Sequence, residues 1–452
     1  MKYVETINPA TEEKVKKYKI FEKRDLDRSL NNSKKASENW KKLSVKQRVS
    51  IMKGISKELL RNKNEYARTI TIEMGKPISQ SIGEIEKCAW LCDYFSKNAE
   101  NFLKNEIIKT ENKKSYIRFD PLGKILCIMP WNFPFWQVFR FAIPSLYAGN
   151  AVILKHSSST LECSLLIEKL FSKFLPKGVF QTVIADTKGV NYLMNYIEGV
   201  SLTGSVNTGK VIGENAGKRI KKFVLELGGS DPFIVLKDAK LRFTCENAVK
   251  ARFINSGQSC IAAKRFIVVK DIADEFADKL LSLVEKLKVG DPLKKTTDIG
   301  PLVNYNQLLS LDIQVKKSIK QGAKVLYGGK IINNKGYFYM PTLITNTNNK
   351  TAVIKEETFG PVMPIIKVKD DREAIKEANN TEFGLGASIW TENRKKAEDY
   401  AKEIEAGAVA INSVVRSDPR MPFGGVKASG IGRELSRYGL LEFTNVKSVV
   451  VN

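Results

Sequence analysis

The alternation of short apolar segments with longer amphipathic ones is the feature of this sequence that most restricts its fold. Six apolar segments of strand length are separated by stretches with helical spacing, at residues 125–129, 151–154, 181–184, 199–202, 233–236 and 266–269. Strands that are separated by helices can pair in parallel, because the helix carries the chain back across the sheet. The pattern therefore predicts an α/β fold with parallel sheets.

The first part of the chain predicts a different local structure. Ser44 and Gln47 have the spacing of a capping box that opens an amphipathic run through Leu60. Gly75-Lys76-Pro77 is a stop signal before a second helix over about 79–102. Residues 106–119 alternate with the shorter period of a β-ribbon.

The apolar segments are also too short for a membrane protein. They fall far below the roughly 20 residues that a membrane span needs, and the start of the chain lacks the apolar core of a signal peptide. The sequence therefore predicts a cytoplasmic protein that does not bind a membrane.

The formal net charge of +25 raises the question of nucleic-acid binding, because lysine and arginine neutralise phosphates. The lysines are spread along the chain, usually beside glutamates, and do not gather in one basic arm. We therefore expect no nucleic-acid partner, and interpret the charge as a lysine-rich solvated surface.

A single histidine narrows the chemistry. His156 is the only imidazole in the chain, and Ser-His-Asp triads, Cys-His pairs and histidine-rich metal sites all need one. The six cysteines include no CxxC pair, which argues against a zinc site or a disulfide scaffold. We expect no metal and a carboxylate as general base.

Cys260 is the candidate nucleophile. It follows Gly257-Gln258-Ser259, a polar turn in which a thiol can lie exposed. We expect it near a helix start, where the partial positive charge lowers the thiol pKa. A buried cysteine without a chemical role is the alternative.

Glu226 and Asn132 are candidates for the other catalytic roles. Glu226 lies in an apolar run, where partial desolvation would raise its pKa toward that of a useful general base. Asn132 lies between Pro130 and Pro134, so its amide can be fixed to donate to an oxyanion. The alternatives are a salt-bridged strand-end glutamate and a turn asparagine.

A glycine-containing segment follows the predicted strand at 199–202. Gly204 and Gly209-Lys210 have the spacing of a P-loop, but Val211 replaces the Ser or Thr that would hold Mg²⁺. We therefore do not predict an NTPase, although backbone amides at this helix start can still bind a pyrophosphate. No G-x-G-x-x-G fingerprint connects a strand to a helix.

Seven motifs in order resemble those of the aldehyde dehydrogenase superfamily along nearly the entire chain, and most closely those of its succinate-semialdehyde dehydrogenases. They are Asn8-Pro9-Ala10-Thr11, Glu73-Met74-Gly75-Lys76-Pro77, Pro130-Trp131-Asn132-Phe133-Pro134, Glu226-Leu227-Gly228-Gly229, Gly257-Gln258-Ser259-Cys260, Glu357-Thr358-Phe359-Gly360-Pro361 and the segment Pro422 to Glu434.

The resemblance implies roles for residues already singled out. Cys260 would attack the aldehyde, and Asn132 with the Cys260 backbone N–H would form the oxyanion hole. Glu226 would activate the water that hydrolyses the thioester. The implied cofactor contacts are Trp131, Lys155, Ser157, Ser158, Thr203, Gly204, Ser205, Leu227, Glu357 and Phe359.

The loop after Lys155 bears on the choice of cofactor. Many NAD-preferring members of the superfamily carry Lys-Pro-Ser-Glu where this chain has Lys155-His156-Ser157-Ser158. A carboxylate at that point would bind the ribose hydroxyls and repel a 2′-phosphate. We therefore expect NADP to be accepted and preferred over NAD, with His156 packed beside the adenosine.

Arg140 is the main indication of substrate. Its position resembles that of the arginine that binds the distal carboxylate in succinate-semialdehyde dehydrogenases, and a guanidinium fork suits a carboxylate. Ser417, with Arg416 and Arg420, is a further candidate donor. A structural salt bridge is the alternative for Arg140.

Two positions depart from that subgroup. Ile254 stands where some of those enzymes have a second arginine, and Ala262 where some carry a regulatory cysteine, so no cysteine-pair switch is expected. We expect oxidation of succinate semialdehyde to succinate. A dehydrogenase of small hydroxyaldehydes such as glyceraldehyde or lactaldehyde, and a non-catalytic binding or structural protein with this fold, are the alternatives.

The resemblance also implies an architecture. A Rossmann-like cofactor domain would comprise residues 1–103 and 121–225, and an α/β catalytic domain residues 226–415. Residues 416–433 would link them near the active site. Residues 104–120 and 434–452 would form a β-ribbon flap for assembly of a homodimer or homotetramer.

Overall fold

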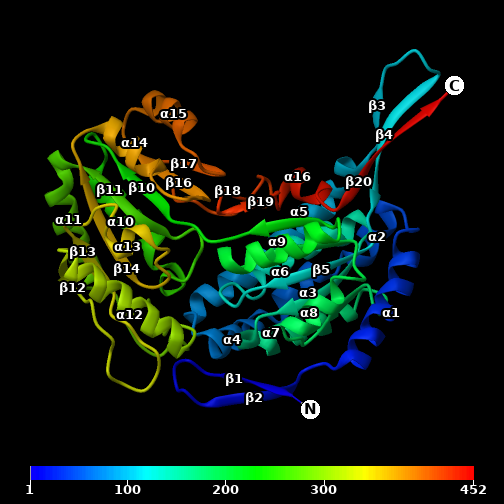
Figure 1. Ribbon diagram of the computed structural model, residues 1–452, viewed down its shortest axis with the longest axis horizontal. Coiled ribbons are helices and arrows are strands. Elements are labelled where there is room, and N and C mark those ends of the chain that lie inside the picture. Colours follow the sequence, from blue (N-terminus) through cyan, green and yellow to red (C-terminus); the bar gives the residue numbers. More distant parts are fainter. Residues whose placement is uncertain (1) are drawn as a thin grey trace.

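Two mainly parallel β-sheets organise the computed structural model, which describes residues 2–452. The sheets lie in two lobes side by side, and a β-ribbon projects from one of them (Figure 1). The α/β class and the parallel sheets predicted from the sequence alternation are therefore confirmed.

The first sheet has six strands, of which only the edge strand β19 is antiparallel. In spatial order they are β19 (Gly430–Ile431), β9 (Lys222–Glu226), β8 (Gly199–Thr203), β5 (Lys124–Met129), β6 (Ala151–His156) and β7 (Phe180–Thr182). The helices of this lobe are α1 (Lys23–Trp40), α2 (Val45–Met52), α3 (Ile55–Arg61), α4 (Lys63–Met74), α5 (Ile78–Leu103), α6 (Trp136–Ala148), η1 (Ser158–Thr160), α7 (Leu161–Ser172), α8 (Thr187–Leu193) and α9 (Val206–Lys218).

The order of these strands reverses between β5 and β8. From β5 the chain proceeds to β6 and β7 on one side, and then returns to β8 and β9 on the other. Helices on the two sides leave in opposite directions, so a crevice opens at the carboxyl ends of β5 and β8, where α/β sheets bind ligands. The segments after Met129 and Thr203 line this crevice.

The second sheet has seven strands, and only the pairing of β12 with β13 is antiparallel. They are β12 (Lys324–Tyr327), β13 (Thr342–Thr345), β14 (Val362–Val368), β11 (Ala263–Val269), β10 (Asp231–Val235), β16 (Gly386–Trp390) and β17 (Ala408–Ile411). Its helices are α10 (Leu241–Phe253), η2 (Ile254–Gly257), α11 (Lys270–Val284), α12 (Tyr305–Lys320), α13 (Ala352–Lys355), α14 (Asp371–Asn379) and α15 (Arg394–Glu403).

Three small antiparallel units complete the fold. The projecting ribbon pairs β3 (Glu106–Ile108), β4 (Lys114–Pro121) and β20 (Thr444–Val451), which brings the two predicted flap segments together. The others are β1 (Tyr3–Ile7) with β2 (Lys14–Lys19), and β15 (Phe383–Gly384) with β18 (Val426–Lys427). Helix α16 (Ser436–Leu441) precedes β20 and packs on α6.

One predicted helix is divided. The run from Ser44 through Leu60 forms two helices, α2 and α3, with a break at Lys53 and Gly54. A Cβ atom at Gly54 would lie 2.2 Å from Cε1 of Phe174, so the close packing of that ring requires glycine here. Glycine is a poor helix former, which favours an interruption at this point.

The junction of α4 and α5 positions the segment that carries Asn132. Gly75 ends α4 in the left-handed conformation, with φ of +80°. The next residue, Lys76, is buried and forms an ion pair with Glu84 of α5. The Glu84 carboxylate also accepts the backbone N–H groups of Phe135 (2.8 Å) and Trp136 (2.9 Å). One buried charge pair therefore connects α5 to the start of α6.

Within residues 2–452, no helix has both the length and the apolar content needed to cross a membrane.

Lys76→Met should strongly destabilise the first lobe, because it leaves the Glu84 carboxylate buried without its cation. Loss of one partner of a buried pair costs about 3–5 kcal/mol. Urea unfolding followed by circular dichroism should show a lower midpoint. The double variant Lys76→Met/Glu84→Gln removes both charges and should recover much of the loss. A wild-type midpoint for Lys76→Met would contradict the assigned role of the pair.

Candidate active site

The carboxyl ends of three neighbouring strands bring candidate residues to one edge of the first sheet. Asn132 follows β5, Thr203 ends β8, and Glu226 ends β9. Parallel strands place their carboxyl ends at the same edge, so residues distant in sequence meet there. Cys260 reaches this edge from the other lobe, on the loop that enters β11.

The loop before Cys260 has an unusual backbone. Asn255, Ser256 and Gly257 all have positive φ, and a Cβ atom at Gly257 would lie 2.2 Å from the Gly360 carbonyl oxygen. Only glycine permits that approach, which brings the cysteine loop against the Glu357–Pro361 motif.

Hydrogen bonds hold Asn132 against the same loop. Its side-chain Nδ2 donates to the Gln258 carbonyl (3.1 Å), and its own carbonyl accepts from Asn255 Nδ2 (2.8 Å). Asn132 is buried. One N–H of its amide is therefore committed to the loop that leads to Cys260, and the second N–H is left for an oxyanion, the role predicted from the sequence.

The environment of Cys260 differs from the sequence expectation. No helix begins at this residue, because the chain passes from a turn directly into β11. Burial raises the pKa of the Cys260 thiol to about 11, while the charges of Arg140 and Lys264 oppose that rise. The prediction that Cys260 lies near a helix start, which would lower the pKa of its thiol, was wrong. The nearby positive charge comes instead from Arg140 and Lys264.

Glu226 has the environment predicted for a general base. Burial raises the pKa of its carboxyl group well above the usual range; the Arg140 charge opposes this shift and Glu434 adds to it. Within residues 2–452, the Glu226 Oε1 atom has no hydrogen-bond partner. That oxygen is available to accept a proton.

A cavity of about 310 Å³ gathers most of the residues named from the sequence. The predicted residues in its lining are Trp131, Asn132, Thr203, Gly204, Ser205, Leu227, Cys260, Glu357 and Phe359. Gln307, Ser310 and Gln314 of α12 line it as well. The sequence analysis missed these three, because an isolated polar residue on an amphipathic helix carries no motif.

Glu357 and Phe359 form one wall of this cavity. The Glu357 Oε1 atom accepts the Gly229 N–H (3.0 Å) and lies 3.4 Å from Lys264 Nζ. The Phe359 ring meets the edge of Trp131, with centroids 5.7 Å apart. Charge and aromatic packing thus fix the two side chains that the resemblance assigns to the nicotinamide half of the cofactor.

A second cavity, of about 350 Å³, contains the Lys155 loop. Lys155, His156 and Ser158 line it, whereas Ser157 accepts the Ser159 N–H (3.3 Å) and caps the following turn. The carboxylate in its lining, Asp186, accepts the Gly189 N–H and caps α8.

His156 is held within the protein at the edge of this second cavity. Its Nδ1 atom lies 2.9 Å from Thr160 Oγ1, and its Nε2 atom 3.0 Å from the Pro134 carbonyl. Burial lowers the pKa of the imidazole to about 4. A neutral, hydrogen-bonded ring fits the packing role expected for it.

The two cavities fit the two halves of a dinucleotide. Ser205, the N-cap of α9, lines the first, and Thr208 in the first turn of α9 lines the second. A helix start directs backbone N–H groups and a partial positive charge at an anion. A pyrophosphate at this point would connect a nicotinamide near Cys260 with an adenosine near Ser158.

Arg140 forms a buried ion pair with Glu434, and its charge acts on Cys260 and Glu226. Its Nη2 atom also donates to Thr203 Oγ1 (3.3 Å), and its guanidinium stacks 4.6 Å from the Phe423 ring centroid. This is the arrangement of the structural alternative, and binding of a substrate carboxylate by Arg140 stays a prediction. Ser417 is buried and accepts a hydrogen bond from Lys87 Nζ (2.8 Å).

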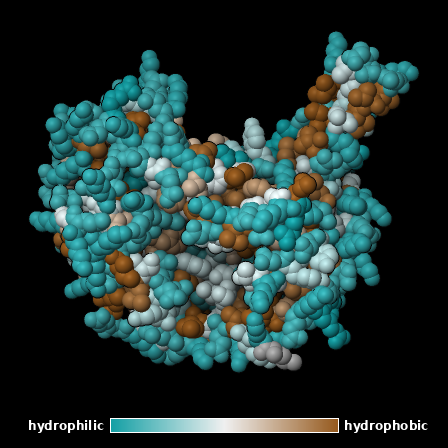
Figure 2. Space-filling model, viewed as in Figure 1, coloured by the Kyte–Doolittle hydropathy of each residue, from teal (hydrophilic) through white to brown (hydrophobic). Residues whose placement is uncertain are grey.

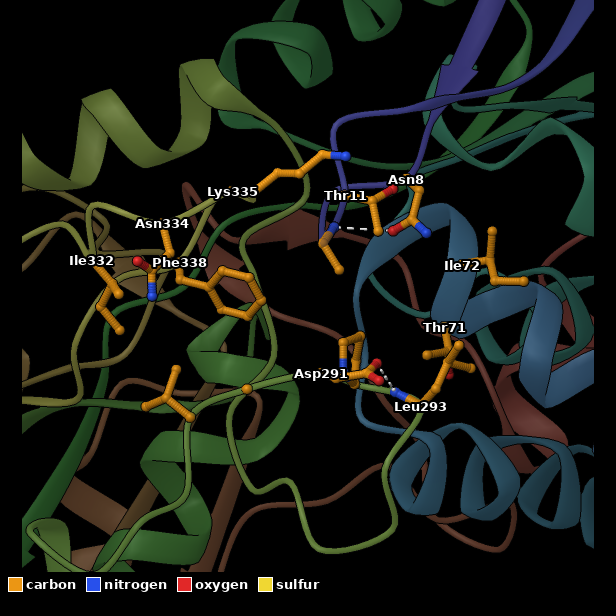
Figure 3. Close-up of a pocket in the computed structure, with 14 residues that line it drawn as sticks. Asn8, Thr11, Thr71, Ile72, Asp291, Leu293, Ile332, Asn334, Lys335 and Phe338 are labelled. Atoms are coloured by element: carbon orange, nitrogen blue, oxygen red, sulfur yellow. Dashed lines mark hydrogen bonds between the residues drawn. The ribbon is translucent and has the colours of Figure 1, made fainter.

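A larger cavity, of about 460 Å³, lies between the β1–β2 turn, α4 and two loops of the second lobe (Figure 3). Asn8 Oδ1 there accepts the Ala10 N–H, and Asp291 Oδ1 the Leu293 N–H. None of the residues predicted for catalysis lines this cavity. The chemistry is therefore expected at Cys260, and not here.

Comparison with known proteins agrees with this geometry. The model of the aldehyde dehydrogenase family matches residues 1–449. A probable NADP(+) succinate-semialdehyde dehydrogenase from Synechocystis sp. is 44% identical over 449 residues, 99% of each chain. The Escherichia coli NAD(P)+ succinate semialdehyde dehydrogenase Sad is 41% identical over 98% of this chain and 97% of its own.

A solved structure extends the likeness to three dimensions. The succinic semialdehyde dehydrogenase of Streptococcus pyogenes, solved in complex with NADP+, superposes with a TM-score of 0.97 at 34% identity, and 99% of each chain is covered. The match over the full length and the shared motifs lead to one conclusion: the chain belongs to the aldehyde dehydrogenase family.

Proposed function

We propose that this protein oxidises succinate semialdehyde to succinate with NADP, and accepts NAD less well. The observation that carries the proposal is that Cys260 and Asn132 line one cavity at the carboxyl edge of the first sheet, while Glu226 ends β9 at the same edge and its charge acts on the Cys260 thiol. The names of the similar proteins support both the substrate and the cofactor.

The first step forms a covalent bond to Cys260. The sulfur attacks the aldehyde carbon, and the carbonyl oxygen becomes an alkoxide. Asn132 Nδ2 and the Cys260 backbone N–H donate to that oxygen, which stabilises the charge that develops in the transition state. A nicotinamide held beside Cys260 by Glu357 and Phe359 would supply the acceptor for the hydride that leaves the substrate carbon, and Cys260 then carries the acyl group as a thioester.

The second step releases the acid. Glu226 removes a proton from a water molecule, the water oxygen attacks the acyl carbon, and the Cys260 sulfur leaves. A carboxyl group whose pKa is raised by burial holds that proton better than an exposed glutamate would. Glu226 is therefore suited to this step without a histidine.

The Cys260 thiol must also lose its proton. With a pKa of about 11, the thiolate costs about 5 kcal/mol at neutral pH. This value already includes the opposing charges of Arg140 and Lys264, and Glu226 provides an acceptor for the proton.

Two substitutions separate the steps. Cys260→Ser should lower aldehyde oxidation by at least about 1000-fold, because a serine hydroxyl is far less ionised than a thiol. Glu226→Gln should still give a burst of one reduced cofactor per site, slowed by loss of the acceptor for the thiol proton, followed by turnover about 100-fold or more slower than wild type. Stopped-flow absorbance of the reduced cofactor measures both. Full turnover by Cys260→Ser would exclude this nucleophile.

Cofactor preference should depend on Ser158. A carboxylate at this position repels the 2′-phosphate of NADP and can bind the ribose hydroxyls of NAD. Ser158→Glu should lower the ratio of kcat/KM for NADP to that for NAD by at least about tenfold. Ser172→Glu, at an exposed position of the same lobe, is the control. An unchanged ratio in Ser158→Glu would refute this role of the loop.

We further propose that residues 416–433 link the cofactor domain (1–103 and 121–225) to the catalytic domain (226–415), and that the protein is cytoplasmic.

We also propose that residues 104–120 and 434–452 assemble the chain into a homodimer or homotetramer. Apolar side chains are visible on the projecting arm in Figure 2. Ile107, Val446 and Val450 there are 68%, 59% and 58% exposed. An exposed strand edge with apolar side chains is a surface that another chain can cover.

Val450→Asp tests the assembly. A charge on this surface should dissociate the oligomer into monomers, because its burial against another chain would be costly. Sedimentation velocity measures the mass. Ile313→Asp, at a residue of α12 that is 62% exposed, is the matched control and should sediment as the wild type. Oligomers that persist unchanged in Val450→Asp would contradict assembly through the ribbon.

A further inference from the structure

Lys87 is a cation near the proposed active site that no step above uses. It lies on α5, and its Nζ atom donates to Ser417 Oγ (2.8 Å) on the loop 412–425. The same atom lies 4.1 Å from the ring centroid of Trp136, the first residue of α6. Burial lowers the pKa of Lys87 to about 8, and the Arg140 charge adds to that shift.

The positive charge of Lys87 has no close negative partner. Within residues 2–452, no carboxylate oxygen lies within 4.0 Å of its Nζ atom. The two carboxylates that act on it from a greater distance are occupied: Glu84 pairs with Lys76, and Asp418 with Arg420 (2.7 Å). An ammonium has three N–H donors, so Lys87 can bind an anion in addition to Ser417.

Arg140 differs from Lys87 in this respect. Its guanidinium already pairs with the Glu434 carboxylate and donates to Thr203. Binding of a second carboxylate would compete with Glu434, which is itself buried. Removal of the partner from a buried ion is costly. Of these two cations, Lys87 is the one with capacity for a carboxylate from outside the protein.

Lys87 lies in the same part of the first lobe as the reacting groups. Its neighbour Trp136 begins the helix four residues after Asn132 and belongs to the large apolar core against which Cys260 packs. The Arg140 charge acts on the Cys260 thiol and on the Lys87 ammonium alike. Both groups therefore lie within electrostatic range of the same side chain.

We propose that Lys87, oriented by Ser417 and Trp136, binds the distal carboxylate of the aldehyde and determines specificity for carboxylated substrates. This rests on the proposed function, because it assigns the recognition of succinate semialdehyde to a residue of that same site. The Trp136 face holds the lysine side chain, and the free N–H groups meet the carboxylate.

The test compares two aldehydes of four carbons, succinate semialdehyde and butanal. Lys87→Met keeps the length of the side chain and removes its charge. It should raise the KM for succinate semialdehyde by at least about tenfold. The kcat for both aldehydes and the KM for butanal should change by less than about threefold. Lys87→Arg should restore most of the affinity. Lys97→Met, an exposed lysine on the same helix, is the control.

The pH dependence gives a second readout. We expect the ratio of kcat/KM for succinate semialdehyde to that for butanal to be constant near neutrality. It should fall as pH rises past about 8, because the ammonium then loses its proton. Groups that act on both substrates cancel in this ratio. The other charged or titratable groups around Lys87 are Arg140, Glu84, Cys88 and Asp418, and the fall should be absent in Lys87→Met.

The outcomes separate this inference from the proposed function. Failure of the wild type to oxidise any aldehyde would contradict both. Normal oxidation of both aldehydes, with equal effects of Lys87→Met on their KM values, would overturn the role of Lys87 alone. A selective rise in the KM for succinate semialdehyde in Arg140→Met, together with no such rise in Lys87→Met, would also overturn the role of Lys87. Butanal oxidation by Lys87→Met shows that the variant is folded.

Discussion

The compensation of buried charge by Arg140 is the constraint on which the catalytic site depends. Two carboxylates, Glu226 and Glu434, lie buried within range of this one guanidinium. Without it, Glu434 would stand unpaired in the interior, at a cost of several kcal/mol, and Glu226 would lose a nearby opposite charge. Arg140 pairs with Glu434, and its charge also opposes the rise in the pKa values of Glu226 and Cys260. The stability of the interior and the ionisation of the Cys260 thiol thus depend on the same side chain.

The commitment of Arg140 to this task changes how a carboxylated substrate can be recognised. An arginine at this position fits a carboxylate by its chemistry, yet its partners are part of the protein. Lys87 differs from Arg140 because its partly buried charge has no paired carboxylate. Its ammonium donates to one hydroxyl and lies against an aromatic ring. In the proposed arrangement, structural and substrate-binding roles are divided between two cations, Arg140 and Lys87, whose charges act on each other.

The site also depends on how the Asn132 segment is held. Glu84 accepts two backbone N–H groups at the start of α6 while it neutralises Lys76. The left-handed backbone before Cys260 then presses the cysteine loop against both Asn132 and the Gly360 carbonyl. Contacts between elements distant in sequence thus fix Asn132 and Cys260, the proposed oxyanion donor and nucleophile, relative to each other.

The sequence by itself determined the α/β class, the strands, the motifs and the family, because each depends on local periodicity or on residues a few positions apart. It also indicated Cys260, Glu226 and Asn132. Only the tertiary structure decided that no helix begins at Cys260, that α2 and α3 are separate, that Arg140 pairs with Glu434, and that Lys87 meets Ser417. Charge pairing and burial join residues hundreds of positions apart, and no local pattern records which cation meets which carboxylate.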